Sequence, residues 1–229
     1  MSYKLFIGDK AFSSWSLRGW LLFEKFNIEV DVKMVGLYDG TMAQDLASFA
    51  PARLVPTVVT PEGWVVGESS AIAETLAERH PEAGIWPADP EARTYARWLV
   101  GEMHAGFSAL RSECPMQLLH VYEGFEVSEA LKSDLTRLEE LLTVAFSKYS
   151  SGGPWLFGDY SAADAFYAPV ATRIAGYDLP VSERIAAYVR SHLEDDAFRA
   201  WRSDGLKVSY DPVPYALDLP TKSWLVAVI

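Results

Sequence analysis

The order of elements predicted for the first 80 residues constrains the fold of this chain more than any other feature. Residues 3–7 form a short apolar run typical of a buried strand, and residues 17–26 place leucines at helical spacing. Residues 29–35 alternate apolar and charged side chains, which predicts a strand with one face in water. Strand, helix and strand in this order make a βαβ unit, so we expect the two strands to be parallel.

A ββα pattern completes this first part of the chain. Residues 42–49 indicate a short helix, and residues 58–59 and 64–66 predict two strands of a hairpin, joined by turn residues at 61–63. Residues 67–70 then open a helix whose apolar positions continue to Ala77. Residues 1–80 are therefore predicted to form a small α/β domain.

The period of the pattern changes after a linker at residues 81–89. Asp89 and Pro90 predict a helix start, and apolar residues continue at helical spacing to Leu110. Ser161 and Asp164 fit a capping box at the start of another helix. Further helices are predicted at residues 128–149, 181–193 and 196–203. We expect an all-helical domain over residues 90–229, with Trp98 in its core and residues 208–229 as an extended tail over apolar surface.

Charge and composition exclude several classes of function. The formal net charge of −11 argues against a general nucleic-acid binder, which needs a basic surface. The sequence contains neither a signal peptide nor an apolar run long enough to span a membrane. The single cysteine, Cys114, excludes an intramolecular disulfide and a paired redox motif, and it fits a reducing cytoplasm. The four histidines lack the spacing of metal ligands, so no metal is expected.

Residues 12–18 form the first candidate site, because small hydroxyl residues lie between a strand and a helix. Ser14 or Ser16 can cap the helix by accepting hydrogen bonds from its free N–H groups. The same position carries the positive end of the helix dipole, which favours a bound anion. A serine hydroxyl there can donate a hydrogen bond to a thiolate or a carboxylate. A cap without a ligand is the simpler interpretation of this stretch alone.

Two residue pairs form the second and third candidate sites. A cis bond between Val55 and Pro56 would turn the backbone of Val55 outward, where an extended peptide can pair with it, although a trans proline at a strand edge is the commoner case. Glu68 and Ser69 stand where a strand ends and a helix begins. Ser69 and the free N–H groups there can bind a carboxylate, and Glu68 can bind an ammonium group. Capping by Ser69 or Ser70 is the alternative.

With these pairs in place, nearly the whole chain resembles the glutathione S-transferases. The resemblance implies an N-terminal thioredoxin-like domain of βαβ-ββα order and an all-α C-terminal domain. The run from Ser13 to Arg18 looks most like the zeta class, the maleylacetoacetate isomerase-like group, whose motif reads Ser-Ser-Cys-Ser-x-Arg. The chain departs from that class at Trp15, where the class has cysteine, and at Leu54, where it has glutamine.

The resemblance also implies roles for individual residues. Ser13 by the zeta pattern, or Ser14 by the theta- and delta-like pattern, donates a hydrogen bond to the sulfur of glutathione. Val55, which precedes Pro56, would pair with the cysteinyl backbone of glutathione. Glu68 and Ser69 would hold the γ-glutamyl end, and Arg53 would reach the glycine carboxylate. Asp164 is structural in this family, and a homodimer is expected.

The second substrate is expected between the domains, against the helix that begins at Pro90. His104, Ser108 and Arg111 fall at i, i+4 and i+7 and would share one face of that helix. Trp15 and Phe107 would wall the pocket, and Arg111 would bind an acidic substrate. A solvated polar edge on a core helix is the alternative for these residues.

The sequence thus predicts a cytoplasmic glutathione transferase-like enzyme that activates the glutathione thiol for addition to an electrophile. Cis–trans isomerisation of a maleyl-type acid is the narrower option. A non-catalytic module of the same fold is the rival, and it would be expected to have lost the serines and the two residue pairs. A thiol-disulfide reductase would need a cysteine in the first loop, where this chain has Trp15.

Overall fold

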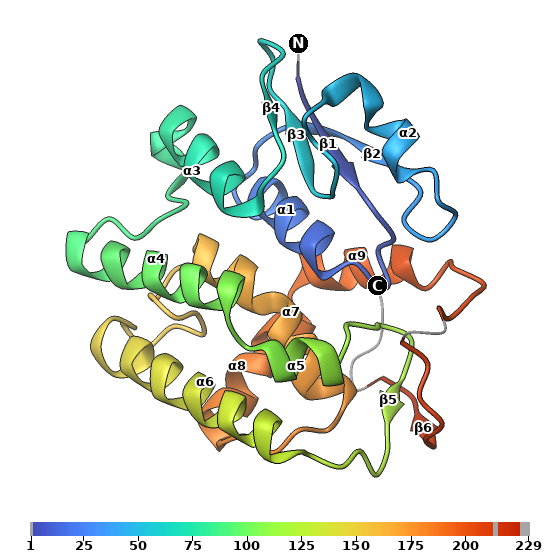
Figure 1. Cartoon of the computed structure of the whole chain (residues 1–229). Helices are drawn as coiled ribbons and strands as arrows, with labels where there is room; N and C mark the ends of the chain where they lie inside the picture. Colours follow the sequence, from blue (N-terminus) through green and yellow to red (C-terminus); the bar gives the residue numbers. More distant parts are fainter. Residues whose placement is uncertain (1, 213–214, 225–229) are drawn as a thin grey trace.

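The computed structural model of the protein describes residues 2–212 and 215–224. Figure 1 shows a sheet with its helices at one end and a group of longer helices at the other. The first group consists of β1 (Tyr3–Ile7), α1 (Ser14–Glu24), β2 (Val30–Met34), α2 (Met42–Asp45), a 3-10 turn (Ala47–Phe49), β3 (Thr57–Val59), β4 (Val65–Val66) and α3 (Ser69–Arg79).

The sheet has the strand order β2-β1-β3-β4. β1 and β2 are parallel, whereas β3 pairs antiparallel with both β1 and β4. This mixed sheet confirms the predicted βαβ-ββα order and is the thioredoxin-like arrangement. α1 contacts β1 and α3 and also α7 and α9 of the helical group, so it joins the two ends of the molecule.

The second group of elements is helical. After a 3-10 turn (Pro81–Ala83) it contains α4 (Pro90–Ala105), α5 (Ser108–Glu113), α6 (Glu129–Lys148), α7 (Ala162–Gly176), α8 (Glu183–Glu194) and α9 (Asp196–Gly205), together with the short strands β5 (Val121–Tyr122) and β6 (Thr221–Lys222). Every residue of α7 is buried, because α1, α4 and α8 all pack against it. The all-α character predicted for this part of the chain is confirmed.

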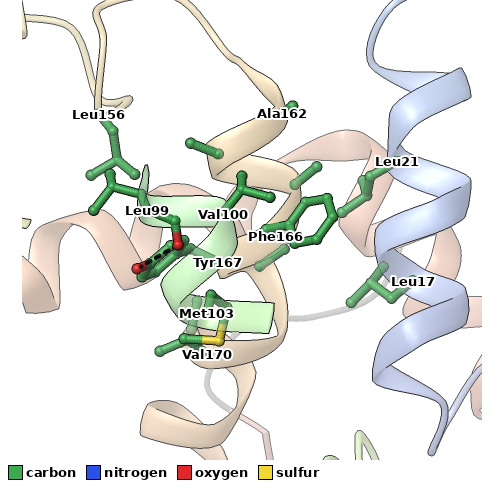
Figure 2. Packing of buried hydrophobic residues seen from close by; sticks show 14 of the residues in the cluster. Leu17, Leu21, Leu99, Val100, Met103, Leu156, Ala162, Phe166, Tyr167 and Val170 are labelled. Carbon is green, nitrogen blue, oxygen red and sulfur yellow. Dashed lines mark hydrogen bonds between the residues drawn. The ribbon is translucent and has the colours of Figure 1, made fainter. Parts of the chain in front are cut away.

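The core between α1, α4 and α7 joins the sheet end to the helical end (Figure 2). Leu17 and Leu21 of α1 face Phe166 of α7, which is fully buried. The Tyr167 hydroxyl donates a hydrogen bond of 3.3 Å to the Leu99 carbonyl of α4, so a buried polar group is paired inside the cluster. Burying such aromatic and aliphatic side chains contributes roughly 1.5–3 kcal/mol per residue.

The prediction of one uninterrupted helix from Pro90 to Leu110 is wrong. α4 ends at Ala105, and Phe107 adopts a left-handed conformation with φ of 54° before α5 begins. A side chain at Gly106 would place its Cβ 2.8 Å from the Glu102 carbonyl oxygen, so the turn requires glycine there. His104 and Arg111 therefore belong to different helices and do not share a helix face.

Two further expectations need correction. Trp98 is 55% exposed on α4 and is not a core residue. The tail is not wholly extended, because β6 pairs antiparallel with β5, with Tyr122 opposite Thr221. The parts of the predicted tail at residues 213–214 and 225–229 lie outside the described residues.

The loop that precedes α1 is held by the last helix of the helical group. The Trp201 indole of α9 donates a hydrogen bond of 2.8 Å to the Lys10 carbonyl. Gly205 lies so close to the loop that a Cβ there would be 3.2 Å from the Ala11 backbone nitrogen. Contact between α9 and this loop thus fixes the residues that lead into Ser13.

The capping box of α7 gives a test of how the helical group is stabilised. The Asp164 carboxylate accepts hydrogen bonds from the backbone N–H groups of Leu156 and Ser161 and from the Ser161 and Tyr188 hydroxyls. Asp164→Ala leaves buried donors without an acceptor, so we expect the free energy of unfolding to fall by about 2–5 kcal/mol. Urea denaturation measures this change.

The control for this test is Asp159→Ala, which alters an exposed carboxylate in the loop that precedes α7. This variant should change the free energy of unfolding by less than about 0.5 kcal/mol. Equal losses in the two variants would contradict a structural role that is specific to Asp164.

Candidate active site

Ser13 caps α1, rather than Ser14 or Ser16 as the sequence suggested. Its hydroxyl accepts a hydrogen bond of 3.3 Å from the Ser16 N–H and donates one of 2.8 Å to the Ser16 hydroxyl oxygen. The Ser16 oxygen in turn accepts a hydrogen bond of 2.9 Å from the Gly8 N–H. Both hydroxyls are buried, so this chain of bonds fixes the start of α1 against the end of β1.

A cavity of about 620 Å³ opens beside the start of α1; we call it the serine cavity. Its lining includes Ser13 and Ser14 from the start of α1, Ser108 and Arg111 from α5, and Arg173 from α7. The lining also includes the apolar and aromatic residues Phe12, Trp15, Leu37, Met42, Val55 and Tyr215. A cavity of this size holds a small organic ligand.

The serine cavity is cationic, although the protein as a whole carries a net charge of −11. Arg173 is buried, and burial together with nearby Arg111 lowers the pKa of its guanidinium to about 10. Burial also lowers the pKa of Arg18, and Arg173 and Arg111 lower it further. Because these cations repel one another, an anion bound between Arg111 and Arg173 would relieve the repulsion.

Ser14 lies next to one of these cations. An Arg173 guanidinium nitrogen, Nη2, lies 3.5 Å from the Ser14 hydroxyl oxygen and can donate to it. The Ser14 proton is then free to point toward a ligand in the serine cavity, whereas the Ser13 proton is already donated to Ser16. Ser14 is thus the better placed of the two hydroxyls to donate to a bound anion.

A smaller hollow of about 290 Å³ adjoins the serine cavity, and we call it the Glu68 hollow. The two share Trp15, Leu54, Val55 and Arg111. The hollow's remaining lining comes from Pro56, Gly67, Glu68, Ser69 and His104. The two spaces therefore adjoin, with the serines beside one and Glu68 beside the other, and we call them together the groove.

The Val55–Pro56 peptide bond is cis. The Pro56 ring packs on α1 at Gly19, where an added Cβ would lie only 2.6 Å from the proline Cβ. Glycine at this position of the helix lets β3 and its preceding loop approach α1 closely enough for Val55 to line both spaces.

Glu68 is the N-cap of α3, so neither Ser69 nor Ser70 caps this helix, as the alternative interpretation had it. Its carboxylate accepts hydrogen bonds of 3.3 Å from the Ser70 N–H and 3.0 Å from the Ser69 hydroxyl. The His104 ring nitrogen Nδ1 lies 3.5 Å from the same carboxylate, and the His104 ring contacts Trp15 at a centroid distance of 5.2 Å. The carboxylate remains partly exposed and faces the groove.

The structure does not bring every predicted site residue to the groove. Arg53 is exposed and lines a third hollow, which shares Leu54 and Gly67 with the Glu68 hollow but includes neither Ser14 nor Glu68. Phe107 is 5% exposed and packs in the hydrophobic core. Arg111 does lie at the groove, although it shares no helix face with His104. Its guanidinium donates to the His104 carbonyl at 3.1 Å and lies 5.1 Å from the Trp15 ring centroid.

Sequence reasoning missed several residues that line the serine cavity, among them Arg173 and Tyr215. Arg173 lies near the end of α7, 159 positions after Ser14, and no local pattern marks it. Tyr215 lies in the tail, where only its aromatic character was noticeable.

Among the described residues, no group of three histidine, cysteine, aspartate or glutamate side chains is arranged to hold a metal ion. No helix within residues 2–212 and 215–224 has both the length and the apolar character needed to cross a membrane.

A thioredoxin-like sheet, a following helical group and a groove with serines at a helix start together define the class. The chain belongs to the glutathione S-transferase family. The profile described as "Glutathione S-transferase, N-terminal domain" matches residues 12–79, which include Ser13, Val55 and Glu68.

The individual relatives point to one branch of that family. A protein of Caenorhabditis elegans named "Probable maleylacetoacetate isomerase" is 32% identical over 159 residues, which cover 68% of this chain and 73% of the relative. The maleylacetoacetate isomerase of Dictyostelium discoideum is 28% identical over 155 residues, covering 64% of this chain and 69% of its own length. These matches confirm the likeness to the zeta class.

Solved structures of the family share the fold. A glutathione transferase homologue from Burkholderia, solved with bound glutathione, has a TM-score of 0.66 at 22% identity and covers 90% of this chain and 98% of its own. The glutathione transferase of Methylococcus capsulatus has a TM-score of 0.63 at 25% identity, with coverages of 89% and 99%.

Cys114 is fully buried, and burial raises the pKa of its thiol to about 12. Because this pKa lies far above pH 8, the thiol stays protonated there, and we expect iodoacetamide to leave the folded protein unmodified. Mass spectrometry after timed exposure at pH 8 checks this expectation. Full alkylation in 8 M urea is the control, and rapid alkylation of the folded protein would contradict it.

Proposed function

We propose that this protein is a glutathione-dependent enzyme of the transferase family that acts on an anionic, electrophilic small molecule. The groove is the observation that carries the proposal, because it brings Ser14 at the start of α1 and Glu68 at the start of α3 into adjoining hollows. Residues 1–80 would bind glutathione, and residues 90–229, after the 81–89 linker, would supply most of the second-substrate site.

Glutathione fits the groove in one direction. Its γ-glutamyl end would lie in the Glu68 hollow, with the ammonium group on the Glu68 carboxylate and the carboxylate on the backbone N–H of Ser69 at the start of α3. Val55, held by Pro56, would pair with the cysteinyl backbone, and the sulfur would then reach the serine cavity. Arg53 is exposed outside the groove, so its contact with the glycine carboxylate would require its long side chain to reorient.

We assign thiol activation to Ser14, and Ser13 to capping. A free thiol ionises near pH ~8.5, and a helix N-terminus with a positioned donor lowers that pKa. The Ser14 hydroxyl would donate to the thiolate while it accepts from Arg173, which polarises it further. The thiolate is the nucleophile.

The second substrate would carry one or more carboxylates. Arg111 and Arg173 would bind them, while Trp15 and Ser108 line the cavity beside them. His104 and the buried Phe107 would support this wall from behind.

For a maleyl-type acid, the thiolate adds to the conjugated double bond and places the electron pair on the adjacent carbonyl as an enolate. Rotation about the new single bond and expulsion of the thiolate restore the double bond in the trans form, so glutathione is not consumed.

The rival is a non-catalytic module with the same fold. It predicts a degraded thiol site, whereas this chain retains both serines, the Val55–Pro56 pair and the Glu68–Ser69 pair in one groove. Retention of the whole set favours the enzyme.

One buried cysteine suits a reducing compartment, so we place the protein in the cytoplasm.

Calorimetric titration of glutathione, with the ultraviolet absorbance of the bound thiolate, tests the proposal. We expect binding between micromolar and low millimolar concentrations. Ser14→Ala should abolish the thiolate signal without changing the melting temperature. Ser13→Ala should keep the signal but lower the free energy of unfolding by about 1 kcal/mol, because it removes a helix cap.

The outcomes separate the two hypotheses. No binding at ten millimolar glutathione would refute the enzyme and favour the interaction module. Loss of the signal in Ser13→Ala alone would reassign the donor. Comparison of anionic and neutral electrophiles follows, and equal rates with both would contradict the role of Arg111 and Arg173.

A homodimer is part of the proposal. Large apolar side chains are exposed in the β3–β4 connection and on α4, with Trp64 at 61% and Trp98 at 55%. Such side chains are enriched where proteins associate. Light scattering of the wild type should give a mass about twice the 25.5 kDa of the chain. Trp98→Glu should lower this measured mass, and a monomeric wild type would refute the dimer.

A further inference from the structure

The tail that follows α9 returns to the start of α1 and brings two tyrosines to the candidate site. The Tyr215 ring stacks on Phe12, with centroids 5.6 Å apart and planes 14° from parallel. Tyr210 contacts the same phenylalanine at 6.0 Å, and Tyr38, from the loop after β2, contacts both tyrosines edge-on. Phe12 directly precedes Ser13, so this aromatic cluster borders the proposed thiol site.

One end of this tail segment is attached to the loop before α1. The Tyr210 hydroxyl donates a hydrogen bond to the Asp9 carboxylate, which also accepts one of 2.7 Å from the Ala11 N–H. The Asp9 carbonyl accepts a hydrogen bond of 2.9 Å from the Ser13 N–H. The tail is thereby tied, through Asp9, to the backbone of the residue that caps α1.

The other end is attached to the helical group. The Tyr122 hydroxyl donates to the Tyr215 carbonyl at 2.9 Å and accepts from the Leu217 N–H at 3.1 Å. The β5–β6 pair and a bond of 2.8 Å from the Glu123 N–H to the Pro220 carbonyl continue this attachment. Tyr215 is thus held by its backbone, and its side chain is available as a wall of the serine cavity.

We propose that Tyr215 is a specificity-determining residue, which the tail places over the second-substrate part of the serine cavity to select flat, conjugated dicarboxylates. The proposal rests on the proposed function for the chemistry of the ligand. The Tyr215 ring, with Phe12 stacked behind it, would lie against a planar unsaturated chain, while Arg111 and Arg173 bind its two ends. A bulky ligand would have to displace the Tyr215 ring from its stack on Phe12.

Calorimetric titration of maleate, a planar dicarboxylate, into the wild type and two variants tests this proposal. Tyr215→Ala removes the ring but keeps the backbone carbonyl that Tyr122 binds, so the tail stays attached. We expect this variant to bind maleate about tenfold more weakly than the wild type. Tyr215→Phe keeps the ring and should bind maleate as the wild type does. Succinate, the saturated analogue, should bind the wild type more weakly than maleate.

Glutathione titration into the same three proteins separates this inference from the proposed function. Tyr215 is not part of the Glu68 hollow, where the γ-glutamyl end of glutathione would bind, so the glutathione affinity should change much less than the maleate affinity. Equal maleate affinity in the wild type and Tyr215→Ala, or no maleate binding to the wild type, would overturn the role of Tyr215. Absence of glutathione binding with a tenfold maleate effect would instead refute the proposed function and leave this role standing.

Discussion

The hydrogen bonds from Ser13 through Ser16 to Gly8 determine where α1 begins, and the candidate site depends on that point. They connect the first turn of the helix to the end of β1, so the strand and the helix cannot shift independently. From this fixed start, Leu17 and Leu21 lie against α7, and Gly19 admits the Pro56 ring. One short polar network thus sets the position of the serine, the peptide-pairing loop and the helix that carries Arg173.

The charge of the groove is opposite to that of the protein. A net charge of −11 would repel anions at long range, yet Arg18, Arg111 and Arg173 gather around Trp15 and Ser14. Burial makes these cations costly, since the pKa of Arg173 falls to about 10. Part of this cost is offset within the protein, because the Arg173 guanidinium donates to the Cys114 carbonyl at 2.8 Å and to the Pro169 carbonyl at 3.2 Å, and an anion in the serine cavity would offset more.

Local patterns predicted most of the fold. The strand–helix–strand order, the hairpin and the α7 capping box are each encoded in one continuous stretch of sequence, and each is confirmed in its type. The break after α4 was not predictable in this way. It depends on Gly106 and on the Asp134 carboxylate of α6, which accepts from the Leu110 N–H at 2.9 Å across 24 residues.

The candidate site divides in the same manner. Ser13, Ser14, Val55 and Glu68 stand at element boundaries that the sequence reveals, and the structure places them along one groove. Arg173 and Tyr215 reach the groove only through tertiary packing, because α7 and the tail return to α1 from distant parts of the chain. Arg53 shows the converse, since nearness in sequence to Val55 did not bring it into the groove.

The attachment of the tail has a consequence for the order in which the protein is made. Every other residue of the serine cavity is synthesised before Tyr215, and β6 cannot pair with β5 until residue 222 has left the ribosome. A nascent chain can therefore assemble the sheet, α1 and α7 while its cavity still lacks one wall. A chain cut before Tyr215 would therefore keep the residues of the sheet, α1 and α7 but would leave the serine cavity open on one side.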